Sequence, residues 1–315
     1  MSYKTKVAIK KSTADIGTPA EYSRKQLEMV KDMIREVADG SMGGMQNIVK
    51  GGDTVLIKIN TVVPSDPGSG FTTDPRMLEA LIELVKEQNP RKIQIGERSA
   101  LGLDTLECMK VCGIVDVAKR TGSELVPFEK QDFITYKIDR PVPFNEFPVP
   151  ESVVNCDVYI GLPKMKVHIH THITNAMKLQ FGNLPDYEWM AKNHGDDIYY
   201  KISNLTKAAN PTWFVVDSLY SCEGNGPFSA YPQDLIKDFN VIYAGSDPVA
   251  VDTVCEALMD WEEPGSAPST VMGAADGLGT NNMDEIAHSV KSATKRFKQD
   301  EGRNKNTQKN TKDHS

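Results

Sequence analysis

The densest group of chemically active side chains lies in the stretch PKMKVHIHTHITNAMKLQFG, which spans residues 163–182. It contains three of the chain's six histidines at alternate positions, together with three lysines: His168, His170, His172, Lys164, Lys166 and Lys178. Imidazole groups bind metals and transfer protons near neutral pH, and lysine ammonium groups bind carboxylates and phosphates. The stretch therefore predicts a site for an anion, a metal or both, but it does not by itself name a reaction.

A divalent metal is one interpretation of the histidines. In an extended segment His168, His170 and His172 point to one side, because the side chains of a strand alternate between its faces. Nickel and zinc both accept imidazole ligands. Two further candidates follow, a histidine in the loop NLPDYEWMAKNHGDD and the aspartate that ends the apolar run WFVVD. The expected metal ligands are His172, His194 and Asp217.

A bound anion is the other interpretation. Lys164 and Lys166 follow the strand-like run CDVYIGLP, and Lys178 lies in a helix that the pattern predicts from about Thr174 to Phe181. The amino end of such a helix offers backbone N–H groups to a carboxylate or phosphate. A solvated basic loop is the structural alternative. The residues expected to bind the substrate are Lys164, Lys166, Asn60 and Arg98.

Candidates for catalysis come from the same stretch and from one loop. The loop SLYSCEGNGPFSAYP places Glu223 among small residues, so we expect this loop to fold over the site. A carboxylate that acts as a general base needs a raised pKa. His168 would transfer protons. The expected catalytic residues are His168, Lys178 and Glu223.

The elements that must position these side chains alternate along the chain. Residues 53–128 are predicted as strand, helix, strand, helix, strand, which is typical of an α/β sheet with right-handed crossovers. The run TVLIKIN is apolar and β-branched enough for a strand buried on both faces. Asp74 and Pro75 then start a helix well. Ligands on such sheets bind at the carboxyl ends of strands, where Asn60, Glu97 and Arg98 fall.

The expected fold is α/β, a mixed and largely parallel sheet flanked by helices. The segment 134–150 contains the Pro-rich and aromatic run DRPVPFNEFPVP and predicts a β-hairpin insertion. We expect one α/β domain over residues 1–290, with a break between two lobes near 130–150 as an alternative. Residues 291–315 carry a surplus of about five positive charges, and from about residue 299 they have no apolar residue to bury. A disordered basic tail is expected there.

Composition excludes several classes of protein. No window approaches about 18 consecutive apolar residues, and no signal peptide is evident, so we expect a cytoplasmic protein without a membrane partner. The five cysteines form no Cys-x-x-Cys run, which excludes an iron–sulfur motif in this chain. Cys108 and Cys112 share a predicted helix face and are expected to be core residues. Because the net charge is −7 although the tail is basic, the body is acidic, which argues against nucleic acid as a partner.

Six motifs occur in an order that resembles the domain of unknown function family 362. They are VLIKIN, TTDP, IGERS with GLDT, CDVYIGLPKMKVHIHTHITNAMK, VVDSLYSCEGNGP and AGSDPVAVD, and they cover roughly residues 50–285. That family is largely uncharacterised, so the resemblance implies a fold rather than a reaction. Many members carry an appended ferredoxin-like module, which this sequence lacks.

More distantly, the order His168, Lys178, His194 resembles the lactate racemase family. The resemblance implies an acid/base role for His168, a tether to a nickel-pincer nucleotide for Lys178 and nickel ligation for His194. The region of the second catalytic histidine of that family holds Glu97 and Arg98 instead.

Three functions remain open from the sequence. The first is an enzyme that acts on a small anionic molecule at the Lys/His cluster, with a divalent metal such as nickel or zinc as an optional cofactor. The second is a non-catalytic protein that binds or carries a metal or an anionic cofactor, together with a redox or maturation partner protein. The third is a lactate-racemase-like isomerase of 2-hydroxy acids.

Overall fold

The computed structural model describes residues 3–100, 102–138, 146–192, 194–195, 197–227, 231–290, 293–295 and 297. The tail predicted for residues 291–315 lies almost entirely outside these ranges. The turn of the predicted hairpin at 134–150 lies outside them too. Within the described ranges, no helix combines the length and the apolar character needed to cross a membrane.

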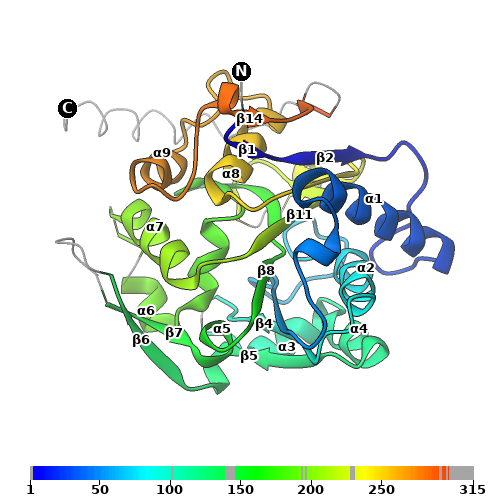
Figure 1. The fold of residues 1–315 in the computed structure, drawn as a ribbon, viewed down its shortest axis with the longest axis horizontal. Helices are drawn as coiled ribbons and strands as arrows, with labels where there is room; N and C mark the ends of the chain where they lie inside the picture. The colour runs from blue at the N-terminus through cyan, green and yellow to red at the C-terminus, as the bar shows by residue number, and fades with distance from the viewer. Residues whose placement is uncertain are drawn as a thin grey trace.

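A mixed sheet forms the centre of the molecule (Figure 1). In spatial order its main strands are β10 (His172–Thr174), β9 (Lys164–His168), β11 (Trp213–Cys222), β8 (Val158–Gly161), β3 (Thr54–Lys58), β4 (Lys92–Glu97) and β5 (Glu124–Pro127). All neighbours from β9 to β5 are parallel, and β10 returns antiparallel to β9. The predicted α/β architecture with a largely parallel sheet is therefore confirmed.

Further strands extend this sheet or stand apart from it. Beyond β11 the sheet continues antiparallel with β13 (Val241–Gly245) and then β2 (Ala8–Lys11), and β12 (Leu235–Ile236) pairs with the end of β11. β1 (Thr5–Lys6) pairs with β14 (Ile286–Ala287). β6 (Phe133–Lys137) and β7 (Glu146–Pro150) form an antiparallel pair, which confirms the two strands of the predicted hairpin.

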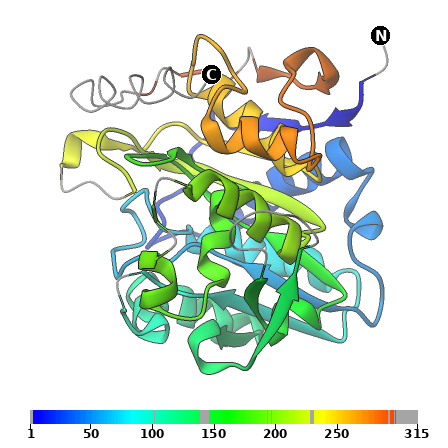
Figure 2. The same cartoon turned by 90° about the vertical axis from the view of Figure 1, so that its left-hand side faces the viewer.

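Helices lie on both sides of the sheet. One group comprises α1 (Arg24–Met42), α2 (Pro75–Lys86), α3 (Thr105–Val111) and α4 (Ile114–Thr121). The other comprises α5 (Glu151–Val154), α6 (Tyr187–Lys192), α7 (Ile198–Ala209), α8 (Pro248–Leu258) and α9 (Pro268–Ala275). Short 3₁₀ segments cover Met45–Asn47, Phe128–Lys130, Lys178–Asn183, Pro232–Asp234 and Met283–Glu285. Figure 2 shows α7 in front of the sheet, and its side chains share a buried apolar cluster with Phe147 of β7 and Phe181.

The helix start predicted at Asp74 is present, and two further helices begin in the same way. The side chains of Asp74, Asp104 and Asp247 each accept a hydrogen bond from a backbone N–H in the first turn of α2, α3 and α8. Such caps satisfy N–H groups that have no partner inside the helix. Cys108 and Cys112 are buried on and just after α3, which confirms the prediction that they are core residues.

The helix predicted from about Thr174 to Phe181 is wrong. The residues up to Thr174 belong to the tight β9–β10 hairpin instead, and only Lys178–Asn183 is helical, as a 3₁₀ helix. The start of this segment is bound from a distant element, because the carboxylate of Asp252 in α8 accepts hydrogen bonds from the N–H groups of Ala176 and Met177. The hairpin also separates the alternating histidines, since His172 lies opposite His168 rather than beyond it in one strand.

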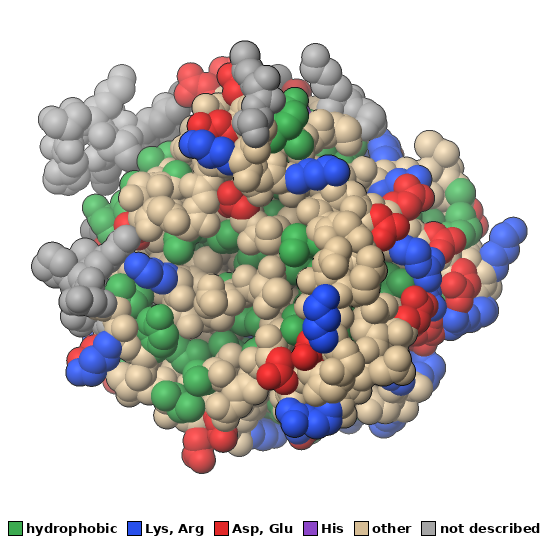
Figure 3. Space-filling view, viewed as in Figure 1, with side chains coloured by type: hydrophobic (Ala, Val, Ile, Leu, Met, Phe, Trp, Pro, Cys, Tyr) green, Lys and Arg blue, Asp and Glu red, His purple; other side chains and the backbone are tan. Residues whose placement is uncertain are grey.

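The surface over α1 and α2 carries charges of both signs, and Figure 3 shows them interspersed on that side of the molecule. Most of these charges on α1 form ion pairs, including Arg24 with Glu28 and Glu83 and Lys31 with Glu87. Interspersed pairs of this kind do not make the continuous basic stripe that recognises nucleic acid.

Candidate active site in a cationic cavity

A cavity of about 380 Å³ lies where β3 and β4 end and the β9–β10 hairpin folds over them. Its polar lining includes residues from several distant segments: Lys58, Asn60, Glu97, Arg98, Lys166, His168, His170, Thr174, Lys178 and His194. The structure thus brings together six of the residues predicted for the site, and Asn60 and Arg98 lie just after the carboxyl ends of β3 and β4 as expected. Among the described lining residues, Glu97 is the sole carboxylate beside four lysine or arginine side chains.

Lys178 presents its amine to this cavity. Its Nζ lies 4.1 Å from the centre of the Phe181 ring, and no hydrogen bond or ion pair of Nζ is found within the part of the chain that the structure describes. Its side chain is reached by solvent only partly, and protein atoms surround the amine closely. Burial, reinforced by the nearby charge of Lys58, lowers the pKa of Lys178 to about 7. An uncompensated amine of this kind is suited to bind an anion.

Lys166 is a second buried amine in the lining. It donates to Asn60 Oδ1 at 3.0 Å and to the Phe71 carbonyl at 2.6 Å, and both acceptors are uncharged. Burial is the main reason that the pKa of Lys166 falls to about 7, and the charges of Lys178 and Lys164 lower it further. Asn60 is itself fixed, because its backbone N–H donates to Thr73 Oγ1 at 2.8 Å. The predicted substrate-binding residues Lys166 and Asn60 therefore form one unit.

Arg98 also lines the cavity, but its guanidinium serves the surrounding loops. Nε donates to the Pro185 carbonyl at 3.2 Å, and Nη1 donates to the carbonyls of Ser99 and Leu103 at 2.9 and 3.0 Å. These bonds hold the segments after β4 and after Lys178–Asn183 together. Arg98 contributes positive charge to the cavity and fixes its wall.

Lys58 and Glu97 form a buried ion pair at the base of the cavity, with 2.5 Å between Nζ and Oε1. Glu97 also accepts hydrogen bonds from the backbone N–H groups of Thr61 and Arg98, both at 2.8 Å. Burial lowers the pKa of Lys58 and raises that of Glu97, and the attraction between the two opposes both changes. Gly182 packs on this pair so closely that a Cβ atom there would lie 2.4 Å from Glu97 Oε1.

His168 is buried with a defined ring orientation. Its Nδ1 accepts hydrogen bonds from the backbone N–H groups of His170 and Thr171, at 3.0 and 3.2 Å. Burial lowers the pKa of His168 well below its usual value, and the charges of Lys178 and Lys166 act in the same direction. The ring is therefore neutral at physiological pH.

His194 faces the cavity from the segment after α6. Its Nδ1 lies 2.6 Å from the Met190 carbonyl, and its ring packs edge-on against Phe181 with 4.8 Å between ring centres. His194 remains partly exposed, and the partial burial of its ring lowers its pKa to about 4, with a further contribution from the charge of Lys178. His170 lies at the exposed turn of the hairpin, 5.9 Å from the ring of His168.

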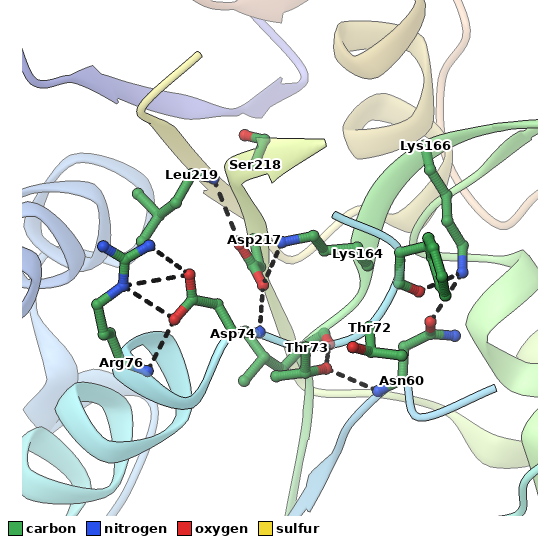
Figure 4. A network of polar contacts seen from close by, with 12 residues as sticks. Asn60, Thr72, Thr73, Asp74, Arg76, Lys164, Lys166, Asp217, Ser218 and Leu219 are labelled. Atoms are coloured by element: carbon green, nitrogen blue, oxygen red, sulfur yellow. Dashed lines mark hydrogen bonds and ion pairs between the residues drawn. The ribbon is translucent and has the colours of Figure 1, made fainter. Parts of the chain in front are cut away.

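Four of the predicted site residues lie outside the cavity lining. Lys164 and Asp217 are fully buried and bind each other, with 3.0 Å between Nζ and each carboxylate oxygen. Figure 4 shows this pair joined through the backbone N–H of Asp74 to the Asp74–Arg76 ion pair. Because both partners are fully engaged, we do not retain Lys164 for substrate binding or Asp217 as a metal ligand.

The other two are His172 and Glu223. His172 has a left-handed backbone (φ 63°) and packs edge-on against Trp261, with 6.2 Å between ring centres, and it is not among the described residues that line the cavity. Glu223 is buried just after β11, and its backbone N–H donates to the Asp234 carbonyl at 2.9 Å. It is not among the described residues that line the cavity.

The predicted metal ligands His172, His194 and Asp217 are thus not brought together. Across the described ranges, no group of three or more His, Cys, Asp or Glu side chains is placed so that it could hold a metal ion. Lys178 and His194, to which the distant resemblance assigns the tether and the nickel of a pincer nucleotide, do line one cavity with His168, but no step below depends on that cofactor. The backbone N–H groups expected at a helix start are also occupied, by Asp252.

Two contributors to the site were missed from the sequence. Thr174 lies opposite Lys166 in the hairpin and lines the cavity, and its buried hydroxyl oxygen has no partner among the described residues. Lys58 lies in the middle of an apolar run, and its ion-pair partner Glu97 is distant in the sequence, so no local pattern indicates the pair. The available signal was that ligands bind at the carboxyl ends of parallel strands, which indicated Glu97 but not Lys58.

Replacing Gly226 with alanine is expected to destabilise the protein, because this glycine packs directly against the backbone of β9. A Cβ atom at Gly226 would lie 1.6 Å from the Val167 carbonyl oxygen, and the Gly226 carbonyl accepts from Ile169 N at 3.1 Å. Backbone on both sides would have to move, so we expect a loss of roughly 2–4 kcal/mol in the free energy of unfolding. Urea denaturation measures it. The matched control is Gly68→Ala, whose Cβ meets nothing within 4 Å, and equal losses in both variants would contradict the packing described.

A comparison with protein families identifies the family of this chain. The model of a domain of unknown function, DUF362, matches residues 55–257, from β3 to the end of α8. The chain belongs to the DUF362 family. The matched segment includes the cavity residues named above. The resemblance found in the sequence motifs is therefore confirmed.

Individual relatives of this DUF362 protein are distant. It is 27% identical to the thylakoid-associated protein sll1697 of Synechocystis sp. over 245 residues, which cover 76% of this chain and 72% of that protein. Among solved structures it is similar to the lactate racemase apoprotein from Thermoanaerobacterium thermosaccharolyticum, with 13% identity and a TM-score of 0.48. That match covers 82% of this chain but spans only 58% of the racemase chain.

Proposed function

We propose that this protein is an enzyme whose substrate is a small anion, a carboxylate or a phosphate, bound in the cavity beside Lys178. The observation that carries the proposal is the charge balance of the lining. Lys58 is neutralised by Glu97, whereas Lys166, Lys178 and Arg98 have no carboxylate partner among the described residues. Buried cations without counter-ions are costly unless a ligand supplies the charge.

The neighbouring groups favour catalysis over simple storage of an anion. Two neutral imidazoles, His168 and His194, share the cavity with the amines. Perturbed lysine and histidine pKa values inside one cavity are typical of active sites. The apolar part of the lining, which includes Leu179, Phe181 and Met190, lowers the local dielectric constant and so strengthens each electrostatic interaction. A carrier would need the anion site but not the pair of imidazoles.

Thermal denaturation with a panel of small anions tests the proposal. We expect pyruvate, oxalate or phosphate to raise the Tm of the full chain, because a ligand that binds the native state alone stabilises it by mass action, about 2.7 kcal/mol at 100 times Kd. Pyruvamide is the matched neutral control and should leave the Tm unchanged. An unchanged Tm with all three anions, or an equal rise with the amide, would contradict an anion site.

The affinity for such an anion should fall as the pH rises from 6 to 8. The protonated amine binds the anion, and a lysine with a pKa of about 7 loses its proton over this interval. For each lysine used, roughly a tenfold loss of affinity is expected. Calorimetric titration with oxalate, which remains a dianion throughout, measures the change. A flat affinity over this range would show that the two amines keep ordinary pKa values.

A further inference from the structure

We infer that His168 and His194 form a fixed donor–acceptor pair, in which His168 Nε2–H polarises a substrate carbonyl and His194 Nε2 removes a proton from the adjacent carbon. The inference rests on the proposed anion site and deepens it, because it names the substrate as a carbonyl compound that carries a carboxylate or phosphate. The two rings line the same cavity, and each is held through its Nδ1. In His168 this nitrogen accepts a hydrogen bond, and in His194 it faces a carbonyl oxygen.

The tautomer of His168 follows from its contacts. Two backbone N–H groups, from His170 and Thr171, donate to Nδ1, so this nitrogen must present its lone pair. The ring proton therefore lies on Nε2, for which no protein partner is found in the described ranges. A proton on Nδ1 would face two N–H donors, so His168 is unsuited to be a general base at Nε2. It can donate a hydrogen bond from Nε2 to a ligand oxygen.

The tautomer of His194 is the reverse. Its Nδ1 lies 2.6 Å from the Met190 carbonyl, which can only accept, so Nδ1 carries the ring proton. Nε2 then holds a free lone pair. The charged and titratable groups that act on this ring include Lys178, His170 and Lys201, and none of these three carries a carboxylate. An anion bound at Lys178 would offset the positive charge that otherwise opposes protonation of His194.

The pair supports a balanced proton abstraction. His194 Nε2 takes the proton as the C–H bond next to the carbonyl breaks, and the electron pair of that bond forms the C=C bond of an enolate. The carbonyl π pair moves onto the oxygen, where the hydrogen bond from His168 Nε2–H stabilises the new charge. Return of the proton to carbon regenerates both rings, so no oxidant or further reactant is required.

The unpartnered hydroxyl of Thr174 is an independent pointer to a polar ligand. This side chain is 4% exposed, lines the cavity and lies opposite Lys166 in the hairpin. A buried hydroxyl without a partner costs free energy that a ligand oxygen would recover. A substrate with an anionic group at the lysines and a second oxygen nearby satisfies this group together with His168.

Nitrogen-15 NMR of the histidine-labelled protein tests the pair without any substrate. At neutral pH we expect His168 to be protonated at Nε2 and His194 at Nδ1, with each signal assigned from its loss in His168→Gln or His194→Gln. His288→Gln, at an exposed histidine outside the cavity, is the control for assignment. Finding either ring in the opposite tautomer overturns the inference.

Deuterium exchange tests the chemistry. With pyruvate or hydroxyacetone phosphate in D₂O, the wild-type protein should accelerate loss of the proton signal next to the carbonyl. His194→Gln should reduce exchange to the uncatalysed rate, His168→Gln should slow it at least tenfold, and His288→Gln should leave it unchanged. If both compounds bind but do not exchange, the inference fails and the anion site stands. If neither binds, the proposed function fails and the inference falls with it.

Discussion

Replacing Lys178 with methionine is expected to weaken the binding of small anions strongly. The amine is the cavity-lining cation for which no acceptor or counter-ion is found in the described ranges, so a bound anion would depend on it. A charge-assisted hydrogen bond of this kind contributes about 1.5–3 kcal/mol, so we expect the affinity for oxalate to fall roughly 10- to 100-fold. Calorimetric titration at pH 6, where the wild-type amine is protonated, measures the loss.

The same variant should not unfold the protein. Methionine fills a similar volume against Phe181 and removes a desolvated amine, so the free energy of unfolding in the absence of anions should be unchanged or higher. Lys207→Met is the matched control, because Lys207 is exposed on α7 and outside the cavity. Oxalate affinity that is equal in both variants would remove Lys178 from the site.

Replacing Glu97 with glutamine is expected to give the largest loss of stability. The change leaves the Lys58 ammonium buried without its counter-charge and sets an amide against the N–H groups of Thr61 and Arg98. Breaking one side of a buried ion pair typically costs about 3–5 kcal/mol. Because the pair forms the base of the cavity, anion binding should weaken as well. Urea denaturation monitored by circular dichroism gives the free energy of unfolding.

Two controls separate the charge effect from general damage. Glu124→Gln breaks the Lys92–Glu124 pair, whose side chains are 46% and 47% exposed, and should cost less than about 1 kcal/mol. The double variant Lys58→Met with Glu97→Leu removes both charges, so it should recover much of the loss seen in Glu97→Gln. A double variant less stable than Glu97→Gln would show that packing, rather than the unpaired ammonium, dominates.

The parts of the fold that depend on local signals could be predicted. Apolar strand runs, the aspartate that begins α2 and the strand pair β6–β7 all appear where the pattern indicated. The cavity could be anticipated because residues after parallel strands meet at one edge of the sheet. That rule placed Asn60 and Arg98 beside Lys166.

The rest depended on contacts between distant segments. Asp252 binds the N–H groups of Ala176 and Met177 from about one quarter of the chain away, so these groups are not available to a ligand. The sequence indicated Asp217 as a metal ligand, because it did not reveal that Lys164 binds both of its carboxylate oxygens. The sequence indicated His168 and His194 as site residues. Only the contacts of each Nδ1 distinguish His168 as the proposed hydrogen-bond donor from His194 as the proposed proton acceptor.

The anion site itself is tested most directly by locating an anion. A crystal of the full chain soaked with sodium selenate gives anomalous difference density at each bound selenium. We predict a peak inside the cavity, within hydrogen-bond distance of Lys178 Nζ, that is absent from Lys178→Met crystals treated in the same way. Peaks confined to the outer surface, or a cavity peak that persists in Lys178→Met, would contradict the assignment.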